Sequence, residues 1–270
     1  MTTRFDRASA VTELSPGRFR ATLAPEWWVV RGPHGGYLAT ILLRCLAAVV
    51  GDDERVPRSL TVHFVSAPAQ GDLDISATVE RTGKSLTSAS ARATQNGEVV
   101  ALALGAFSVP WEGGFEFSDA TMPTAMAFED AFRVPVEGPD FPPFLGNFDM
   151  RWAIGDPPFT GSEHARIGGW FRLAEAQPAD AFVVATLMDA WPPVVFPPAT
   201  TPLVAPTIDL TIHFREPLPV AGAAPDDFYL GFFSSKLSHE GFFEEDGELW
   251  SPDGRLLAQS RQLALTIPRR

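Results

Sequence analysis

The sequence is poor in cysteine, in positive charge and in long apolar runs, and each shortage excludes a class of protein. Its 270 residues contain one cysteine, Cys45, so an internal disulfide framework and a cysteine-rich metal site are excluded. Lys and Arg number 21 against 33 Asp and Glu, a formal net charge of −12, which argues against a nucleic-acid partner or an anionic membrane surface.

Apolar stretches end well before the ~18 residues of a membrane span, and residues 1–23 have no apolar segment typical of a secretory signal. We therefore expect a cytoplasmic protein with no membrane span. What the sequence does have is material for a core: 45% hydrophobic residues, with 21 Phe and 7 Trp. At roughly 100–200 residues per domain, the length permits two domains or one large one.

The chain repeats itself once. Residues 60–64 (Leu-Thr-Val-His-Phe) recur as residues 210–214 (Leu-Thr-Ile-His-Phe), and residues 95–101 resemble residues 252–258 in the same order along the chain. Several matches in one order indicate a duplication, and a duplication decides the fold. We place an N-terminal unit at residues 1–110, a connecting segment at 111–161 and a C-terminal unit at 162–270.

Both units share one pattern of predicted elements. Apolar residues at helical spacing predict a buried helix over 37–50 and a second helix over 179–191, stopped by two prolines. Alternating residues and Asn-Gly or Asp-Gly turns predict strands over 59–66, 74–82, 85–95, 98–109, 165–173, 207–215, 227–234, 240–250 and 255–267. In the connecting segment we expect a short helix at 124–132 and a strand near 147–152. One buried helix against a long antiparallel sheet is an α+β arrangement.

Three short motifs carry a family resemblance. They are Gly-Pro-His-Gly-Gly-Tyr at 32–37, Arg-Thr-Gly-Lys-Ser at 81–85 and Pro-Thr-Ile-Asp at 206–209. In their order and spacing the chain resembles the acyl-CoA thioesterase II family, whose members hold two hot dog units in one chain. The resemblance implies a double hot-dog fold and hydrolysis of an acyl-CoA thioester to free acid and CoA, with no metal and no organic cofactor.

The resemblance also implies a set of catalytic residues. In that family an Asp, a Thr and a Gln hold the hydrolytic water, and they align with Asp189, Thr207 and Gln262. Asp189 can accept a proton from the water, and the other two can fix its orientation. The equivalent of Gln262 in the first copy is Gly105 or Leu104, so we expect one site per chain.

Further candidates surround this set. His34, Gly35 and Gly36 are at the start of the first helix, where backbone N–H groups and the helix dipole favour the oxyanion of a thioester. A glycine turn that only lets the helix enter the sheet explains these residues equally well. Candidates for contacts with the CoA phosphates are Arg58, Arg81 and Lys84, although an ordinary solvated charge is the alternative for each.

Other hydrolytic chemistries fit less well. The sequence has no Gly-x-Ser-x-Gly elbow, Cys45 lies among apolar helix residues where a thiol is inert, and no zinc-ligand spacing occurs. His63 and His213 hold equivalent positions in the two copies, which favours a structural role. Two alternatives stay open: a non-catalytic acyl-CoA or lipid-binding hot-dog protein, and a thioesterase acting on acyl-carrier-protein. The family resemblance also leaves room for homo-oligomers of such chains.

Overall fold

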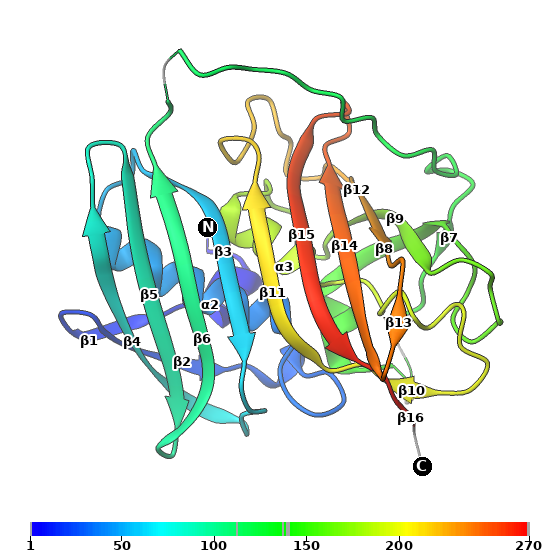
Figure 1. Cartoon of the computed structure of the whole chain (residues 1–270), viewed down its shortest axis with the longest axis horizontal. Coiled ribbons are helices and arrows are strands. Elements are labelled where there is room, and N and C mark those ends of the chain that lie inside the picture. The colour runs from blue at the N-terminus through cyan, green and yellow to red at the C-terminus, as the bar shows by residue number, and fades with distance from the viewer. Residues whose placement is uncertain (1, 112, 137, 139–140, 269–270) are drawn as a thin grey trace.

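The computed structural model describes residues 2–111, 113–136, 138 and 141–268. One antiparallel sheet runs through the whole molecule in the order β1-β2-β4-β5-β6-β3-β11-β15-β14-β12-β9-β8-β7, with β13 paired to β14 beside this path. The helices lie behind the sheet in the view of Figure 1. None of the helices in the described part of the chain is long and apolar enough to cross a membrane.

The first half of the chain wraps its strands around one long helix. Its elements are α1 (Arg4–Ala8), β1 (Thr12–Ser15), β2 (Arg18–Leu23), η1 (Pro25–Trp27), α2 (Gly35–Val50), β3 (Val56–Phe64), β4 (Gly71–Thr82), β5 (Leu86–Gln95) and β6 (Glu98–Ser108). As predicted, α2 is buried nearly all round, and it packs against β3, β4, β5 and β6. It ends at Gly51, whose φ of 61° is the left-handed conformation common at helix C-termini.

The second half repeats the pattern with a shorter helix. Its elements are β7 (Phe132–Arg133), η2 (Pro143–Asn147), β8 (Phe148–Ile154), β9 (Arg166–Leu173), α3 (Ala181–Leu187), β10 (Leu203–Val204), β11 (Thr207–Phe214), β12 (Tyr229–Ser234), β13 (Ser238–His239), β14 (Phe242–Trp250), β15 (Leu256–Leu265) and β16 (Ile267–Pro268). Every strand predicted from the sequence overlaps an observed strand, including β8 near residues 147–152. Strands β10 and β16 form a separate two-stranded sheet.

The two halves meet where β3 pairs with β11, the strands that carry the repeated sequence. Thr61 lies opposite Thr211, and their hydroxyl oxygens are 3.0 Å apart. Equivalent residues of the two copies therefore face each other across a local two-fold axis. These strands lie in the middle of the sheet (cyan and yellow in Figure 1), so the hydrogen-bonded ladder continues from one half into the other without an edge.

The predicted helix over 179–191 is too long. Helix α3 spans Ala181–Leu187, with Asp180 as its N-cap, accepting hydrogen bonds from the first backbone N–H groups. The chain then tightens, and the N–H of Asp189 reaches back to the carbonyl of Thr186 over 3.4 Å. The apolar spacing continues past this point in the sequence, but two prolines follow at 192–193 and cannot extend a helix. Asp189 therefore lies in the turn after α3.

The predicted helix at 124–132 is wrong, because the structure has a turn at 128–130 and the start of β7 at Phe132 there. The segment is instead fixed by side chains: the Phe128 and Phe228 ring centroids lie 4.6 Å apart, and Trp170 donates to the carbonyl of Met126. Aromatic packing explains its composition without a helix. Residues 112, 137, 139 and 140 of the connecting segment lie outside the described residues.

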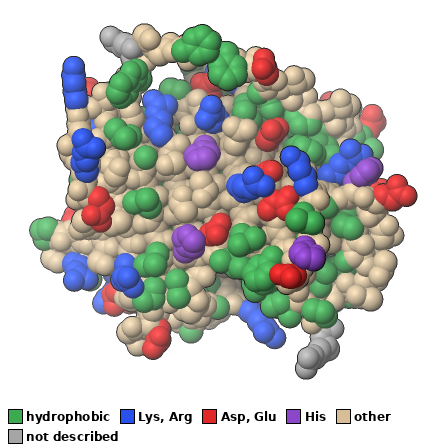
Figure 2. All heavy atoms as spheres, viewed as in Figure 1, with side chains coloured by type: hydrophobic (Ala, Val, Ile, Leu, Met, Phe, Trp, Pro, Cys, Tyr) green, Lys and Arg blue, Asp and Glu red, His purple; other side chains and the backbone are tan. Residues whose placement is uncertain are grey.

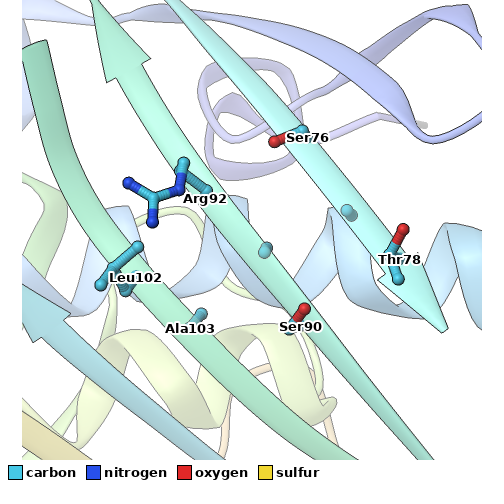
Figure 3. Close-up of a pocket in the computed structure, with 8 residues that line it drawn as sticks. Ser76, Thr78, Ser90, Arg92, Leu102 and Ala103 are labelled. Atoms are coloured by element: carbon cyan, nitrogen blue, oxygen red, sulfur yellow. The ribbon is translucent and has the colours of Figure 1, made fainter. Parts of the chain in front are cut away.

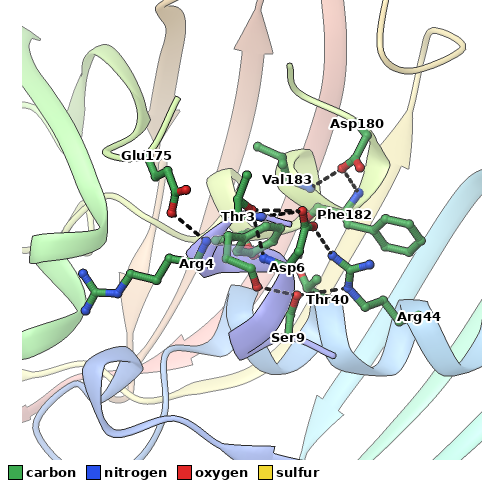
Figure 4. Close-up of polar contacts among 12 residues, drawn as sticks. Thr3, Arg4, Asp6, Ser9, Thr40, Arg44, Glu175, Asp180, Phe182 and Val183 are labelled. Carbon is green, nitrogen blue, oxygen red and sulfur yellow. Dashed lines mark hydrogen bonds and ion pairs between the residues drawn. The ribbon is translucent and has the colours of Figure 1, made fainter. Parts of the chain in front are cut away.

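A short N-terminal helix, not predicted from the sequence, is held to α2 by Arg44, which also contacts α3. Arg44 of α2 donates to Asp6 Oδ1 over 2.9 Å and to Ser9 Oγ over 3.0 Å, and its guanidinium lies 4.3 Å from the centroid of the Phe182 ring of α3 (Figure 4). Asp6 and Thr3 form a capping box at the start of α1. Arg44 thus connects α1 and α2 in the first half of the chain to α3 in the second.

Candidate active site

Asp189 lies where the end of α3 meets the start of α2. Its side chain is 14% exposed, and its Oδ2 accepts a hydrogen bond of 2.8 Å from the backbone N–H of Gly36. Burial raises the pKa of Asp189, and the N–H groups of Gly36 and Gly35 oppose that rise. Burial thus favours the neutral carboxyl of Asp189, whereas the positive end of α2 favours the ionised carboxylate, the form that can accept a proton.

Both glycines are needed for this contact. A Cβ on Gly35 would lie 2.7 Å from Asp189 Oδ2, and a Cβ on Gly36 would lie 2.7 Å from the carbonyl oxygen of Thr186. These are closer than a real Cβ approaches, so any side chain there would push α2 away from α3. The glycines allow the two helices to meet and at the same time place their N–H groups on Asp189.

His34 is a neutral hydrogen-bond donor in this site. Its Nδ1 accepts from the N–H of Tyr37 over 3.1 Å, so Nε2 carries the proton and donates to the carbonyl oxygen of Asp189 over 2.7 Å. Nε2 also lies 3.5 Å from Asp189 Oδ2. Burial lowers the pKa of His34, and the ring stacks on Phe144. His34 therefore fixes the Asp189 turn rather than acting as a base.

Thr207 and Gln262 form the second part of the site. Thr207 begins β11, Gln262 lies on the adjacent β15, and the Thr207 hydroxyl donates to Gln262 Oε1 over 2.8 Å. The structure thus brings these two predicted residues into direct contact, while Asp189 makes its contacts with the start of α2.

Glu245 is a residue of this site that the sequence analysis missed. It lies on β14 and is only 4% exposed; its Oε1 accepts from Gln262 Nε2 over 2.6 Å, and its Oε2 accepts from the backbone N–H of Val194 over 2.9 Å. Burial raises the pKa of Glu245 to about 7, with a further contribution from the negative charge of Asp189. Alternation along the strand could have revealed it, because Phe243 and other apolar residues share its inward face.

The equivalent corner of the first half is apolar. By strand register, Gly105 holds there the position that Gln262 has in the second half, and Ala89 holds that of Glu245. A Cβ on Gly105 would already lie 3.0 Å from Leu46 Cδ1. The polar constellation therefore occurs once among the residues that the structure describes.

The basic candidates lie at the other end of α2. Arg58 is near the start of β3, Arg81 is near the end of β4, and Lys84 is in the turn that follows. Register brings these three residues to one end of the sheet. Arg55 holds that turn by donating to the carbonyls of Gly83 and Lys84.

A separate hollow of about 320 Å³ lies over β4, β5 and β6. Figure 3 shows the Arg92 side chain extending toward the strand of Leu102, with the hydroxyls of Thr78 and Ser90 further along the neighbouring strands and a helix behind them. None of its lining residues belongs to the group around Asp189. On the sheet face shown in Figure 2, basic, acidic and hydrophobic side chains are intermixed.

Thiol and metal chemistry find no support in the described residues. Cys45 is fully buried, and burial raises its pKa to about 12, so it has no thiolate to offer. No group of three His, Cys, Asp or Glu side chains in the described part of the chain could hold a metal ion. The expectation that no cofactor is needed stays a prediction.

Comparison with protein families identifies the class of this chain. Residues 24–108 match the acyl-CoA thioesterase N-terminal domain, and residues 122–266 match the acyl-CoA thioesterase C-terminal domain. The fold is that of hot dog proteins, and the two family models identify the chain as a thioester hydrolase. The chain belongs to the acyl-CoA thioesterase family, as its sequence motifs predicted. None of the curated proteins compared with it matches the chain.

Solved structures share the fold over the full length of the chain. A conserved hot dog protein of unknown function from Alicyclobacillus acidocaldarius is 26% identical with a TM-score of 0.88, covering 100% of both chains. A candidate thioesterase II from Thermobifida fusca YX is 25% identical with a TM-score of 0.84, covering 98% of each chain. The acyl-CoA thioesterase II TesB2 from Mycobacterium marinum, at 20% identity, a TM-score of 0.77 and 98% of each chain, is similar in fold.

Proposed function

We propose that this double hot-dog chain hydrolyses an acyl-CoA thioester to the free acid and CoA at one site, through a water held by Asp189, Thr207 and Gln262. The single observation that carries the proposal is the buried Asp189 carboxylate, held by the N-terminus of α2 in a chain of the acyl-CoA thioesterase family. The division into units at 1–110 and 162–270, joined by 111–161, is part of this proposal, as is the cytoplasmic location expected from the sequence.

The hydrogen bonds of the site define the orientation of the water. The Thr207 hydroxyl hydrogen is used on Gln262, so its oxygen lone pairs can accept one hydrogen of the water, and Asp189 can accept the other. The second Nε2–H of Gln262 can donate to the water oxygen, which leaves one lone pair for the thioester carbonyl carbon. As the new C–O bond forms, the proton moves to Asp189. When the C–S bond breaks, that proton goes to the departing CoA sulfur.

We propose that the N–H groups of His34, Gly35 and Gly36 stabilise the oxyanion that forms as negative charge moves from Asp189 to the thioester oxygen. In the free protein, Gly36 donates to the Asp189 carboxylate, and His34 Nε2, which donates to the Asp189 backbone carbonyl, lies 3.5 Å from Oδ2. When Asp189 takes the water proton, the negative charge passes to the thioester oxygen, and the N–H groups beside the carboxylate can stabilise the oxyanion.

The basic residues Arg58, Arg81 and Lys84 are our candidates for CoA phosphate contacts. Phe64, at the far end of β3 from Arg58, has its ring 3.3 Å from where a Gly35 Cβ would lie. Six residues of strand separate Arg58 from Phe64, a length of ~20 Å. A phosphate at Arg58 would therefore be joined to a thioester at Asp189 by an extended arm, as the pantetheine arm of CoA provides.

Asp189→Asn tests the catalytic assignment. The Asn side chain keeps an oxygen for the Gly36 N–H but cannot accept the water proton, so kcat should fall ~100-fold or more with little change in KM. Asp209→Asn, on the face of β11 opposite to that of Thr207, is the matched control. Comparable turnover by Asp189→Asn and the wild type would refute the role of Asp189.

Release of CoA, followed with a thiol reagent over saturated, branched and aromatic acyl-CoAs, tests the activity itself. We expect at least one of these thioesters to be hydrolysed. Micromolar binding without release would instead identify an acyl-CoA or lipid-binding protein, and activity restricted to acyl-carrier-protein thioesters would identify that substrate class. Light scattering of the same sample would establish whether the chain forms homo-oligomers.

A further inference from the structure

The carboxylate of Glu245 decides which way the Gln262 amide faces. An ionised carboxylate only accepts hydrogen bonds, and the backbone N–H of Val194 already occupies Oε2. The group of Gln262 that meets Oε1 over 2.6 Å must therefore be the amide NH2. That leaves the amide oxygen for Thr207, and Thr207 must donate its hydroxyl hydrogen. The ionised carboxylate of Glu245 thus sets which group donates and which accepts in both hydrogen bonds of the series Thr207–Gln262–Glu245.

Glu245 also connects the two parts of the site. Val194, whose N–H it binds, lies five residues after Asp189 in the same loop, and Gln262 lies on the neighbouring strand β15. Both bonds are buried, where a charge-assisted hydrogen bond is strong and an unpartnered donor is costly. One side chain therefore holds the Gln262 amide and the loop that carries Asp189.

We infer that Glu245 is a positioning residue for thioester hydrolysis, whose ionised carboxylate orients Gln262 so that Thr207 accepts from the hydrolytic water. This inference rests on the proposed function. Glu245 touches neither the water nor the substrate; it acts through Gln262.

Protonation of Glu245 reverses this chain of hydrogen bonds. A neutral carboxyl group has one O–H donor, which would meet the Gln262 amide oxygen after the amide turns over. Gln262 Nε2 would then donate to Thr207, and the Thr207 hydroxyl hydrogen would point at the water. The water then gains a donor where it needs an acceptor, so turnover falls.

The charges around Glu245 place this change near neutral pH. Burial, as the largest cause, and the negative charges of Asp189 and Asp246 together raise the pKa of Glu245 to about 7, against the bonds from Val194 and Gln262, which lower it. Asp189 approaches from the turn after α3, and Asp246 is the next residue on β14. The active, ionised form of Glu245 is therefore lost as the pH falls through about 7.

Glu245→Gln, compared with the wild type from pH 5.5 to 8.5, tests the inference. The amide of this variant resembles the neutral carboxyl at every pH, so kcat at pH 8.5 should be about tenfold lower, the factor for one misdirected hydrogen bond, with KM little changed. The difference in kcat between this variant and the wild type should shrink as the pH falls, because Glu245 of the wild type then becomes neutral as well. Glu244→Gln, the same substitution on the outer face of β14, should leave kcat unchanged. A deficit that is constant with pH, or no deficit, overturns the inference.

A second variant keeps the test decisive if Glu245→Gln does not fold. Asp246→Asn preserves both hydrogen bonds of Glu245 and removes one negative charge beside it, so at low ionic strength the acid limb of the kcat profile should move to lower pH. An unmoved limb overturns the inference. Wild-type CoA release in the same assay separates this outcome from failure of the proposed function, which would give no turnover at any pH.

Discussion

At the scale of single residues, the site is unusual in burying two carboxylates. The Asp189 carboxylate accepts from the N-terminus of α2 and has His34 Nε2 3.5 Å away, whereas the Glu245 carboxylate accepts from a side-chain amide and a single backbone N–H. The family resemblance predicts Asp189, Thr207 and Gln262 as the residues that hold the water. It could not identify Glu245, because acidic residues are common on strands and only the inward direction of this one makes it exceptional.

Glu245 makes stability depend on pH. Its pKa is raised from 4.5 to about 7 by burial, so the folded protein binds a proton that the unfolded chain releases. The stability it contributes is fully present below pH 4.5 and is lost as the pH rises through 7, about 3 kcal/mol in all. From pH 5 to pH 8, urea unfolding should show a larger loss of stability for the wild type than for Glu245→Gln. Equal slopes for the two proteins would contradict this.

The Thr207 hydroxyl should matter for turnover more than for folding. Thr207→Val keeps the shape of the side chain but leaves Gln262 Oε1 without its donor and removes an acceptor for the water. We expect kcat to fall about tenfold, while Thr207→Ser, which keeps the hydroxyl, retains most of it. Steady-state release of CoA measures both. A Val variant as active as the Ser variant would exclude a hydroxyl contact with the water.

At the scale of elements, strands were easier to predict than helix ends. Alternation and Asn-Gly or Asp-Gly turns are local signals, and they fixed every predicted strand to within a few residues. Helix α3 ends where its last turn tightens, before Pro192. The helical spacing of apolar residues continues through 188–191, so the sequence pattern does not reveal where the helix ends. The elements at 4–23 were not predicted, because α1 owes its place to contacts with Arg44, far along the chain.

The close approach of α2 and α3 predicts a steric cost. Gly36→Ala would place its Cβ 2.7 Å from the Thr186 carbonyl oxygen and 3.0 Å from Asp189 Cβ. Separating the helices should cost roughly 1–3 kcal/mol of stability and displace Asp189. Gly146→Ala, which meets no atom within 4 Å, is the matched control. The melting temperature and the rate of CoA release should both fall for Gly36→Ala and stay unchanged for Gly146→Ala. An unaffected Gly36→Ala would show that the two helices can move apart without cost.

At the scale of the whole molecule, β3 pairs with β11, and we expect the repeated units to unfold as one body for that reason. Neither half could unfold alone without exposing the unpaired ladder of the other half, from Ser59 to His63 or from Asp209 to His213.

Unfolding should therefore be a single transition. Trp27 reports on the first half and Trp191 on the second, and both are buried. Tryptophan fluorescence and far-UV circular dichroism should give coincident curves in urea. Two separated transitions would show that the halves are independent domains.

The pairing of β3 with β11 also determines whether the two halves stay together after a protease cuts between them. Phe115 and Phe117, which follow β6 in the connecting segment, are 92% and 78% exposed, and they lie outside any helix or strand. Limited chymotrypsin should nick the chain there. Because β3 and β11 remain hydrogen-bonded, the nicked molecule should migrate as one particle under native conditions and as two bands after denaturation. That result would show that the covalent link between the halves is dispensable once the sheet has formed, whereas separation of the fragments under native conditions would show that it is needed.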